Sequence, residues 1–122
     1  MTHTAYPESF YAASANPTPE RPALQGEVET DVCVIGAGYT GLSTAISLLE
    51  NGFKVCIVEA AKVGFGASGR NGGQIVNSYS RDIDVIERSV GLKQAQLLGQ
   101  MAFEGGRIIR ERIAKYNIKC DL

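Results

Sequence analysis

Three glycines directly after a short apolar run constrain this chain more than any other feature. The run Asp31–Ile35 is followed by GAGYTG, which places Gly36, Gly38 and Gly41 in the spacing G-x-G-x-x-G. The first glycine permits a sharp turn, the second leaves room for a pyrophosphate beside the backbone, and the third lets a helix pack closely on the strand. We therefore expect a strand, a tight turn and a helix whose N-terminus faces phosphate groups.

A second strand is expected after that helix. Apolar residues recur at helical spacing over Tyr39–Asn51, and Gly52 stands where a helix would stop. The short apolar run Lys54–Val58 then has the character of a buried strand. Strands joined by such a helical crossover lie parallel and are usually covered on both faces. The sequence predicts an α/β fold with a Rossmann-like, FAD- or NAD-binding βαβ unit.

Glu59 ends the second strand, at the position where a carboxylate accepts hydrogen bonds from a ribose diol. A carboxylate there would repel the 2′-phosphate of NADP, so NAD and FAD remain as candidate cofactors. The chain contains no G-x-x-x-x-G-K-[ST] motif, which excludes an ATPase P-loop.

A second glycine-rich stretch, GFGASGRNGGQ, covers residues 64–74 and holds five glycines. Glycine loses more backbone freedom on folding than any other residue, so the stretch is either a flexible linker or a backbone that touches a ligand. Its successive amides, the Ser68 hydroxyl and Arg70 suit the far side of a pyrophosphate and the edge of a flavin ring. This stretch favours FAD over NAD.

The remaining chain indicates two helices and an N-terminal extension. We expect a short helix near Asp82–Ser89 and a longer one over 92–116, in which Gly105–Gly106 marks close packing or a kink. Residues 1–28 contain all four prolines and are expected to be irregular, with Tyr6, Phe10 and Tyr11 able to fix them to a partner surface.

One βαβ unit with two helices is less than a complete doubly wound sheet. We therefore expect residues 29–122 to be the N-terminal part of the FAD-binding domain of a two-domain flavoprotein, with the substrate domain outside this chain.

Composition excludes several classes of function. The net charge is −1, so nothing indicates nucleic acid as a partner. No apolar stretch approaches the roughly 20 residues of a membrane span, and no signal peptide is recognisable. Cys33, Cys56 and Cys120 lack metal-ligand spacing, so we expect buried thiols, no metal site and a cytoplasmic protein. His3 is the only histidine, which argues against a catalytic triad in this chain.

Beyond these motifs, four stretches resemble the FAD-dependent oxidoreductases of the D-amino-acid oxidase group. They are SFYAASAN, DVCVIGAGYTGLSTA, VEAAKVGFGASGRNGGQIVNSYSRDIDVIE and FEGGRIIRERI. GFGASGRNGGQ followed by NSYSRD is far more restrictive than the glycine fingerprint alone. Within that group, the chain is most similar to the members that oxidise gamma-glutamylputrescine.

The resemblance implies FAD as the cofactor and assigns its binding residues. The first three glycines would hold the pyrophosphate and Glu59 the adenosine ribose, while Ser68 would lie nearest the phosphates and the last glycines nearest the flavin ring. The implied set is Gly36, Gly38, Tyr39, Thr40, Gly41, Glu59, Ala60, Ser68, Gly69, Arg70, Asn71, Gly72, Gly73 and Gln74.

The resemblance also implies a reaction. A small-molecule amine would be oxidised to an imine, which is hydrolysed to an aldehyde and ammonia, and oxygen would be reduced to hydrogen peroxide. No catalytic residue is assigned to this chain, which is expected to be inactive on its own. The absence of His and Cys between Glu59 and Ser80 argues against covalent flavin attachment there.

Three alternatives remain open at the level of the sequence. The protein could be another member of the group, acting on a D-amino or N-methyl amino acid as an oxidase or dehydrogenase. It could also be a non-catalytic dinucleotide-binding module, or the product of a broken reading frame. The oligomeric state is not indicated by any motif.

Overall fold

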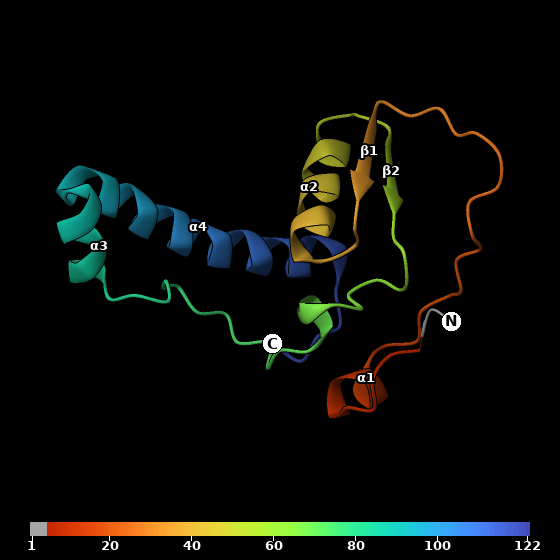
Figure 1. The fold of residues 1–122 in the computed structure, drawn as a ribbon, viewed down its shortest axis with the longest axis horizontal. Helices are drawn as coiled ribbons and strands as arrows, with labels where there is room; N and C mark the ends of the chain where they lie inside the picture. Colours follow the sequence, from red (N-terminus) through yellow and green to blue (C-terminus); the bar gives the residue numbers. More distant parts are fainter. Residues whose placement is uncertain (1–4) are drawn as a thin grey trace. The chain divides into compact units, whose positions relative to one another are not determined.

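The computed structural model describes residues 5–122, so His3 lies outside the described residues. The chain forms two compact units, the first extending to Gly72 and the second covering Gly73–Leu122. In Figure 1, both strands belong to the first unit, and the two helices drawn in teal and blue, in the later part of the chain, belong to the second.

The first unit is built around two parallel strands joined by a helix. Strand β1 (Val32–Ile35) leads into helix α2 (Tyr39–Glu50), and strand β2 (Val55–Val58) returns beside β1 (Figure 1). The strands pair in parallel with Val32 opposite Val55, and α2 packs against both of them. The predicted α/β class and the parallel strand pair are confirmed.

Hydrogen bonds at both ends of the strands fix this register. Before β2, the Lys54 amide donates to the Asp31 carboxylate at 2.7 Å, and the Thr30 hydroxyl donates to the Lys54 carbonyl at 2.7 Å. After β1, the Gly36 amide donates to the Val58 carbonyl at 2.8 Å. Gly52, with φ of +85°, follows the end of α2 and lets the chain turn back toward β2.

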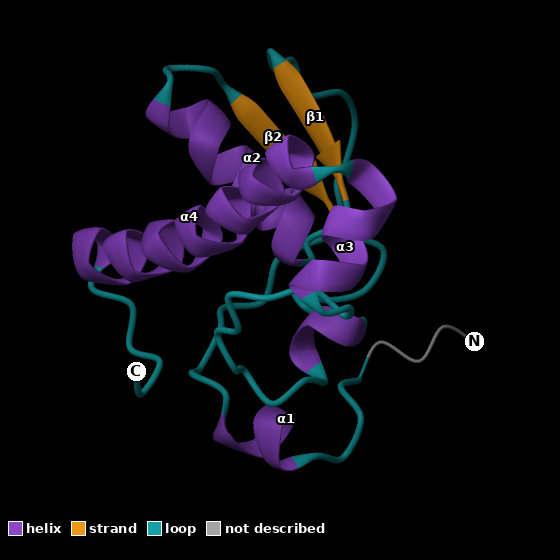
Figure 2. Cartoon of the chain, turned by 90° about the vertical axis from the view of Figure 1, so that its left-hand side faces the viewer, coloured by secondary structure: helices purple, strands orange, loops and turns teal. Residues whose placement is uncertain are grey.

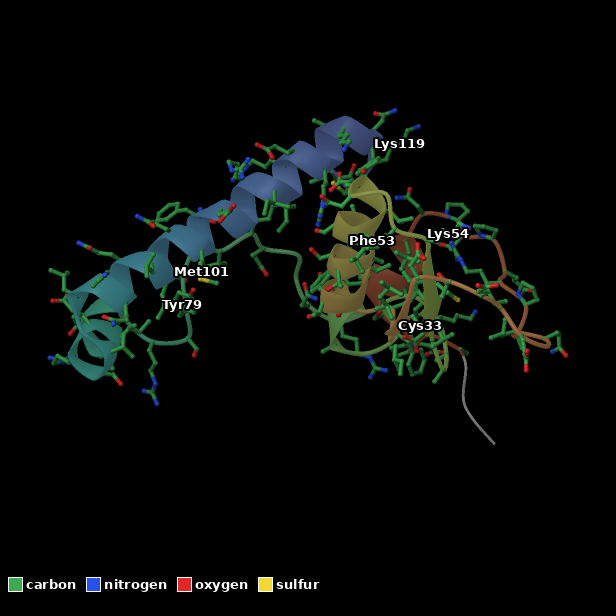
Figure 3. The ribbon with its side chains drawn as sticks, turned by 90° about the horizontal axis from the view of Figure 1, so that it is seen from above. Cys33, Phe53, Lys54, Tyr79, Met101 and Lys119 are labelled. Carbon is green, nitrogen blue, oxygen red and sulfur yellow. The ribbon has the colours of Figure 1, made fainter. Side chains whose placement is uncertain are left out.

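Only one face of the sheet is covered among the described residues. The Val34 side chain faces α2, whereas Ile35 is 88% exposed and Cys33 is exposed (Figure 3). The expectation that β1 is covered on both faces is therefore wrong for residues 5–122. The buried hydrophobic side chains that the structure describes are small, namely Ala37, Ala45 and Ala95.

The cysteines also differ from the expectation of buried thiols. Cys33 and Cys120 are exposed and Cys56 is half-buried. Cys33 is exposed because alternate residues of a strand point to opposite faces, and its face is the one that α2 does not cover. Apolar neighbours in the sequence predicted burial, but the tertiary packing decides it.

The N-terminal extension is not wholly irregular. Helix α1 (Phe10–Ser14) follows Ser9, whose hydroxyl accepts a hydrogen bond from the Ala12 amide at 3.1 Å. This N-cap interaction stabilises one helical turn in a stretch that contains no proline. The prolines on either side had predicted irregular structure there. No other helix or strand occurs in the described residues before β1.

The second unit consists of a loop and two helices. Helix α3 (Ile83–Val90) packs against helix α4 (Leu92–Tyr116), and Gly91, with φ of +84°, joins them (Figure 2). The Tyr79 hydroxyl donates to the Leu98 carbonyl at 2.8 Å, which holds the loop along α4 (Figure 3). Both helices lie where the sequence predicted them. No helix among the described residues has the length and apolar character that crossing a bilayer requires.

Gly106 is the close-packing position of α4. It is buried, and a Cβ atom there would lie 2.5 Å from Oδ1 of Asn77 and 3.5 Å from the Ile75 side chain. Gly105 is exposed, and a Cβ atom there would meet nothing within 4 Å. Of the two explanations for the Gly-Gly pair, close packing is the one that the structure shows.

The two glycines form a matched pair for a stability test. We expect Gly105→Ala to stabilise the protein by up to about 1 kcal/mol, because alanine has the higher helix propensity. Gly106→Ala should be less stable than Gly105→Ala by about 1–3 kcal/mol, because the added methyl group must displace the Asn77 amide. Denaturant unfolding of both variants measures the difference, and equal stabilities would contradict the packing at Gly106.

Candidate cofactor-binding site

The turn between β1 and α2 depends on the absence of side chains at two glycines. Gly36 has φ of +98°, a conformation that other residues rarely adopt. A Cβ atom at Gly41 would collide with the carbonyl oxygen of Gly36 and would lie 3.3 Å from the Val34 side chain. The first and third glycines of the motif therefore have the turn and packing roles that their spacing predicted.

The N-terminus of α2 offers unsatisfied amide groups. Its N-cap residue, Gly38, has no side chain to accept hydrogen bonds, and the first backbone bond of the helix runs from the Leu42 amide to the Gly38 carbonyl at 2.9 Å. Among the described residues, the amides of Thr40 and Gly41 have no hydrogen-bond partner. Such amides, together with the helix dipole, attract an anion.

Ser68 completes this end of the helix. The Tyr39 amide donates to the Ser68 hydroxyl oxygen at 3.1 Å. Because the oxygen accepts this bond, the hydroxyl proton remains available for a second group. A Cβ atom at Gly38 would lie 3.0 Å from the same oxygen, so the glycine also makes room for Ser68.

Glu59 joins the end of β2 to the glycine turn. Its carboxylate accepts a hydrogen bond from the Ala37 amide at 2.7 Å through Oε2 and one from the Ala61 amide at 3.0 Å through Oε1. Each carboxylate oxygen has a second lone pair, so the group can still accept hydrogen bonds from a diol. The side chain is exposed, which leaves it accessible to a ligand.

The glycine-rich stretch folds back onto the turn. The Gly64 amide donates to the Ala37 carbonyl at 2.9 Å, and residues Ala67–Gly69 form a 3₁₀ turn. A Cβ atom at Gly69 would collide with the Gly64 carbonyl oxygen, so this glycine is required for the close approach. Residues 60–72, which include the stretch as far as Gly72, therefore form an ordered loop, termed the 60–72 loop below, and not a flexible linker.

Asn71 and Arg70 stabilise the 60–72 loop from within. The Asn71 side-chain amide donates to the carbonyls of Ala67 and Ser68, each at 3.1 Å, and it hydrogen-bonds the Tyr39 hydroxyl. Arg70 donates through Nε to the Phe65 carbonyl at 3.2 Å, and its guanidinium carbon lies 5.4 Å from the Phe65 ring centroid. Both side chains thus order the loop that carries them.

The structure brings most of the predicted set together in the first unit. These residues are Gly36, Gly38, Tyr39, Thr40, Gly41, Glu59, Ala60, Ser68, Gly69, Arg70, Asn71 and Gly72. Gly73 and Gln74 belong to the second unit, so their place beside the others stays a prediction. Ala37 and Gly64 also belong to the site through their backbone groups, and neither was predicted. For Gly64, the sequence signal was a glycine in the glycine-rich stretch that had been given no role, whereas Ala37 gave no signal. Among the described residues, no cluster of His, Cys, Asp and Glu could hold a metal ion.

The pKa of Glu59 lies below its ordinary value, mainly because of the hydrogen bond from the Ala37 amide and then that from Ala61. Its ionised form is therefore favoured by folding. The resulting stabilisation is present above the pKa that the Glu59 carboxyl has in the unfolded chain, and it is lost as the pH falls through the lower pKa of the folded state.

This shift can be measured by NMR titration of the protein with ¹³C-labelled glutamate. The resonance that Glu59→Gln removes should titrate with a midpoint below the ordinary value of a glutamate carboxyl. Glu27→Gln, in the exposed extension, should leave that resonance unchanged. A midpoint at or above the ordinary value would show that the bond to Ala37 is absent.

Known proteins resemble this chain over most of its length. The family model described as DAO, FAD dependent oxidoreductase, matches residues 31–122. The chain is 60% identical over 118 residues to gamma-glutamylputrescine oxidoreductase of Escherichia coli (strain K12), a match that covers 97% of this chain and 28% of that protein. It is 48% identical over 124 residues to probable oxidoreductase OrdL of Haemophilus influenzae, covering 99% of this chain and 29% of the relative.

A shorter match, 49% identical over 49 residues, links 39% of the chain to 12% of D-amino acid dehydrogenase 2 of Pseudomonas aeruginosa. No solved structure matches the chain significantly. The chain thus spans less than a third of the length of the curated relatives named here. Because the family match covers residues 31–122, well over half of the chain, the protein belongs to the DAO family of FAD-dependent oxidoreductases.

Proposed function

We propose that the turn after β1 and the N-terminus of α2 bind the pyrophosphate of FAD, within a Rossmann-like βαβ unit. The observation that supports this most strongly is the uncapped helix N-terminus, where the amides of Thr40 and Gly41 have no partner among the described residues. Gly38 leaves space directly beside these amides, and the Ser68 hydroxyl has a proton to donate to a phosphate oxygen. An anion with several oxygens fits this donor set.

Glu59 is proposed to bind the adenosine ribose. Two backbone amides already fix the orientation of its carboxylate, and the remaining lone pairs can accept both hydroxyls of a diol. The ionised state favoured by these amides is also the state that accepts such bonds. Toward the flavin, we propose Arg70, Asn71, Gly72, Gly73 and Gln74 of the glycine-rich stretch. Ala60 and Gly69 are proposed as further residues that bind the cofactor.

For the domain organisation, we propose an N-terminal extension over residues 1–28 and a cofactor-binding part over 29–122. The family match that begins at residue 31 supports this boundary. Since the chain spans less than a third of its relatives named above, the substrate domain and the catalytic groups are proposed to lie elsewhere in the full-length protein. This chain alone is proposed to be inactive, and the full-length protein to be cytoplasmic.

The proposed reaction is the oxidation of an amine, with gamma-glutamylputrescine as the substrate and putrescine catabolism as the setting. Its support is the 60% identity to a relative that carries this substrate in its name. FAD, when bound, would take up a hydride equivalent from the amine-bearing carbon while the nitrogen loses a proton, which leaves an imine. The residues of this chain contribute by binding and orienting the cofactor. Hydrolysis of the imine then yields an aldehyde and ammonia, and the electrons pass to oxygen, which forms hydrogen peroxide.

Anaerobic reduction of the purified full-length protein tests the substrate. We expect a yellow protein whose flavin absorbance is bleached by gamma-glutamylputrescine and hardly at all by D-alanine or sarcosine. Bleaching by D-alanine instead would favour the D-amino acid chemistry that the match to D-amino acid dehydrogenase suggests. A colourless protein that binds no FAD would contradict the proposed function.

The phosphate site is tested at Gly38. We expect Gly38→Ala to weaken FAD binding by about tenfold or more, because its methyl group enters the space proposed for the pyrophosphate and approaches Ser68. Equilibrium dialysis with FAD measures the affinity.

Ser68→Ala separates the two causes. Ser68→Ala alone loses the proposed hydrogen bond to the phosphate, so it is the reference for the double variant Gly38→Ala with Ser68→Ala, in which the contact with the serine oxygen is gone. We expect the double variant to bind FAD more weakly than Ser68→Ala, and this further loss must come from the pyrophosphate space. Equal affinities of the double variant and Ser68→Ala would mean that Gly38 serves Ser68 alone.

A further inference from the structure

Tyr6, in the N-terminal extension, contacts the 60–72 loop from a distant part of the sequence. Its hydroxyl donates to the Val63 carbonyl at 2.6 Å, across 57 residues of chain. Its ring centroid lies 6.3 Å from that of Phe65, and the Lys62 ammonium nitrogen lies 5.4 Å from the Tyr6 ring centroid. Three different contacts thus converge on one short part of the loop.

The same part of the loop is tied to the glycine turn on its other side. Gly64 lies between the two residues that Tyr6 contacts, and its amide donates to the Ala37 carbonyl at 2.9 Å. Phe65 in turn accepts the hydrogen bond from Arg70 and stacks beneath its guanidinium group. Tyr6 therefore holds the segment through which the loop reaches the proposed phosphate site.

Tyr6 attaches the extension to this loop by a hydrogen bond and two ring contacts. A cavity of about 130 Å³ remains between the extension and the loop, with Tyr6, Tyr11, Phe65 and Arg70 among its lining residues. Phe10 is 78% exposed and packs edge-on against Tyr11 of its own helix. The Tyr11 hydroxyl makes no hydrogen bond within residues 5–122. Tyr11 is therefore a matched control for Tyr6.

The 60–72 loop is rich in glycine, so the contact with Tyr6 affects how readily the loop is ordered. Four of the residues 64–72 are glycines, so the loop gains much conformational entropy when it is released. A contact that holds Val63 and Phe65 lowers the number of conformations from which the loop must be ordered when a ligand binds. By holding Val63 and Phe65, Tyr6 therefore favours the conformation of the loop that binds a ligand.

We propose that Tyr6 is a positioning residue that holds the 60–72 loop against the glycine turn and thereby slows the release of FAD. The inference rests on the proposed cofactor site and adds a residue of the extension to it. Tyr6 does not touch the reacting atoms in this proposal. Its effect is on cofactor retention and not on the chemical step.

The test compares Tyr6→Phe, Tyr6→Ala, Tyr11→Phe and Tyr11→Ala in the full-length protein. Release of FAD is followed by the rise in flavin fluorescence after dilution. We expect Tyr6→Phe to release FAD about fivefold faster than wild type, the effect of one lost hydrogen bond. Tyr6→Ala should be about tenfold faster or more, since the ring contacts are lost too. Tyr11→Phe should release FAD at the wild-type rate, and Tyr11→Ala should release it more slowly than Tyr6→Ala, because Tyr11 lines the cavity but makes no hydrogen bond to the loop.

The outcomes separate this proposal from the one on which it depends. If the wild-type protein contains no FAD, the proposed cofactor site fails. If wild type retains FAD and Tyr6→Phe releases it at the wild-type rate, the role of Tyr6 is overturned. Faster release from Tyr6→Phe with an unchanged melting temperature of the apoprotein supports the proposal. Faster release of FAD from Tyr6→Phe together with a lower melting temperature of the apoprotein would contradict the proposal, because Tyr6 would then stabilise the fold as a whole.

Discussion

The buried residue Ala37 connects the three segments of the candidate site. Its amide donates to the Glu59 carboxylate at the end of β2, and its carbonyl accepts from the Gly64 amide of the 60–72 loop. Ala37 itself is 2% exposed, whereas the Glu59 carboxylate that it binds is open to solvent. Because the peptide groups on both sides of one residue are engaged, a shift of the turn would move the acid and the loop together. Ala37 is one of the unspecified positions of the G-x-G-x-x-G motif, yet its backbone holds the site together.

The glycines near Ala37 contribute to the site because they have no side chain. Gly41 and Gly69 each allow a carbonyl oxygen to approach where a side chain would collide, and Gly38 leaves space for the Ser68 hydroxyl. As a result, the amides of the helix N-terminus, the Ser68 hydroxyl and the Glu59 carboxylate lie around one turn, to which backbone amides fix them. Groups of this kind bind phosphate and ribose and do not contact the rest of a ligand. This explains how a chain with few charged site residues can belong to a cofactor-dependent family.

Much of the fold could be predicted from the sequence because its signals are local. Helical periodicity ends at Gly52, and the observed helix α2 ends at Glu50 with Asn51 as its C-cap. The long helix was predicted over the residues 92–116 that form α4. The exposed thiol of Cys33 and the short helix α1 were not predicted, since the first depends on which sheet face is covered and the second on one capping hydroxyl. The hydrogen bond from Tyr6 to Val63 could not be predicted either, because a single contact across 57 residues leaves no periodic pattern in the sequence.

The central claim is that the N-terminus of α2 binds the FAD pyrophosphate. A crystal structure of the full-length protein with FAD tests it most directly. The pyrophosphate oxygens should lie within hydrogen-bond distance, about 3 Å, of the Thr40 or Gly41 amide and of the Ser68 hydroxyl. A cofactor bound elsewhere, with these amides contacting only water, would contradict the claim.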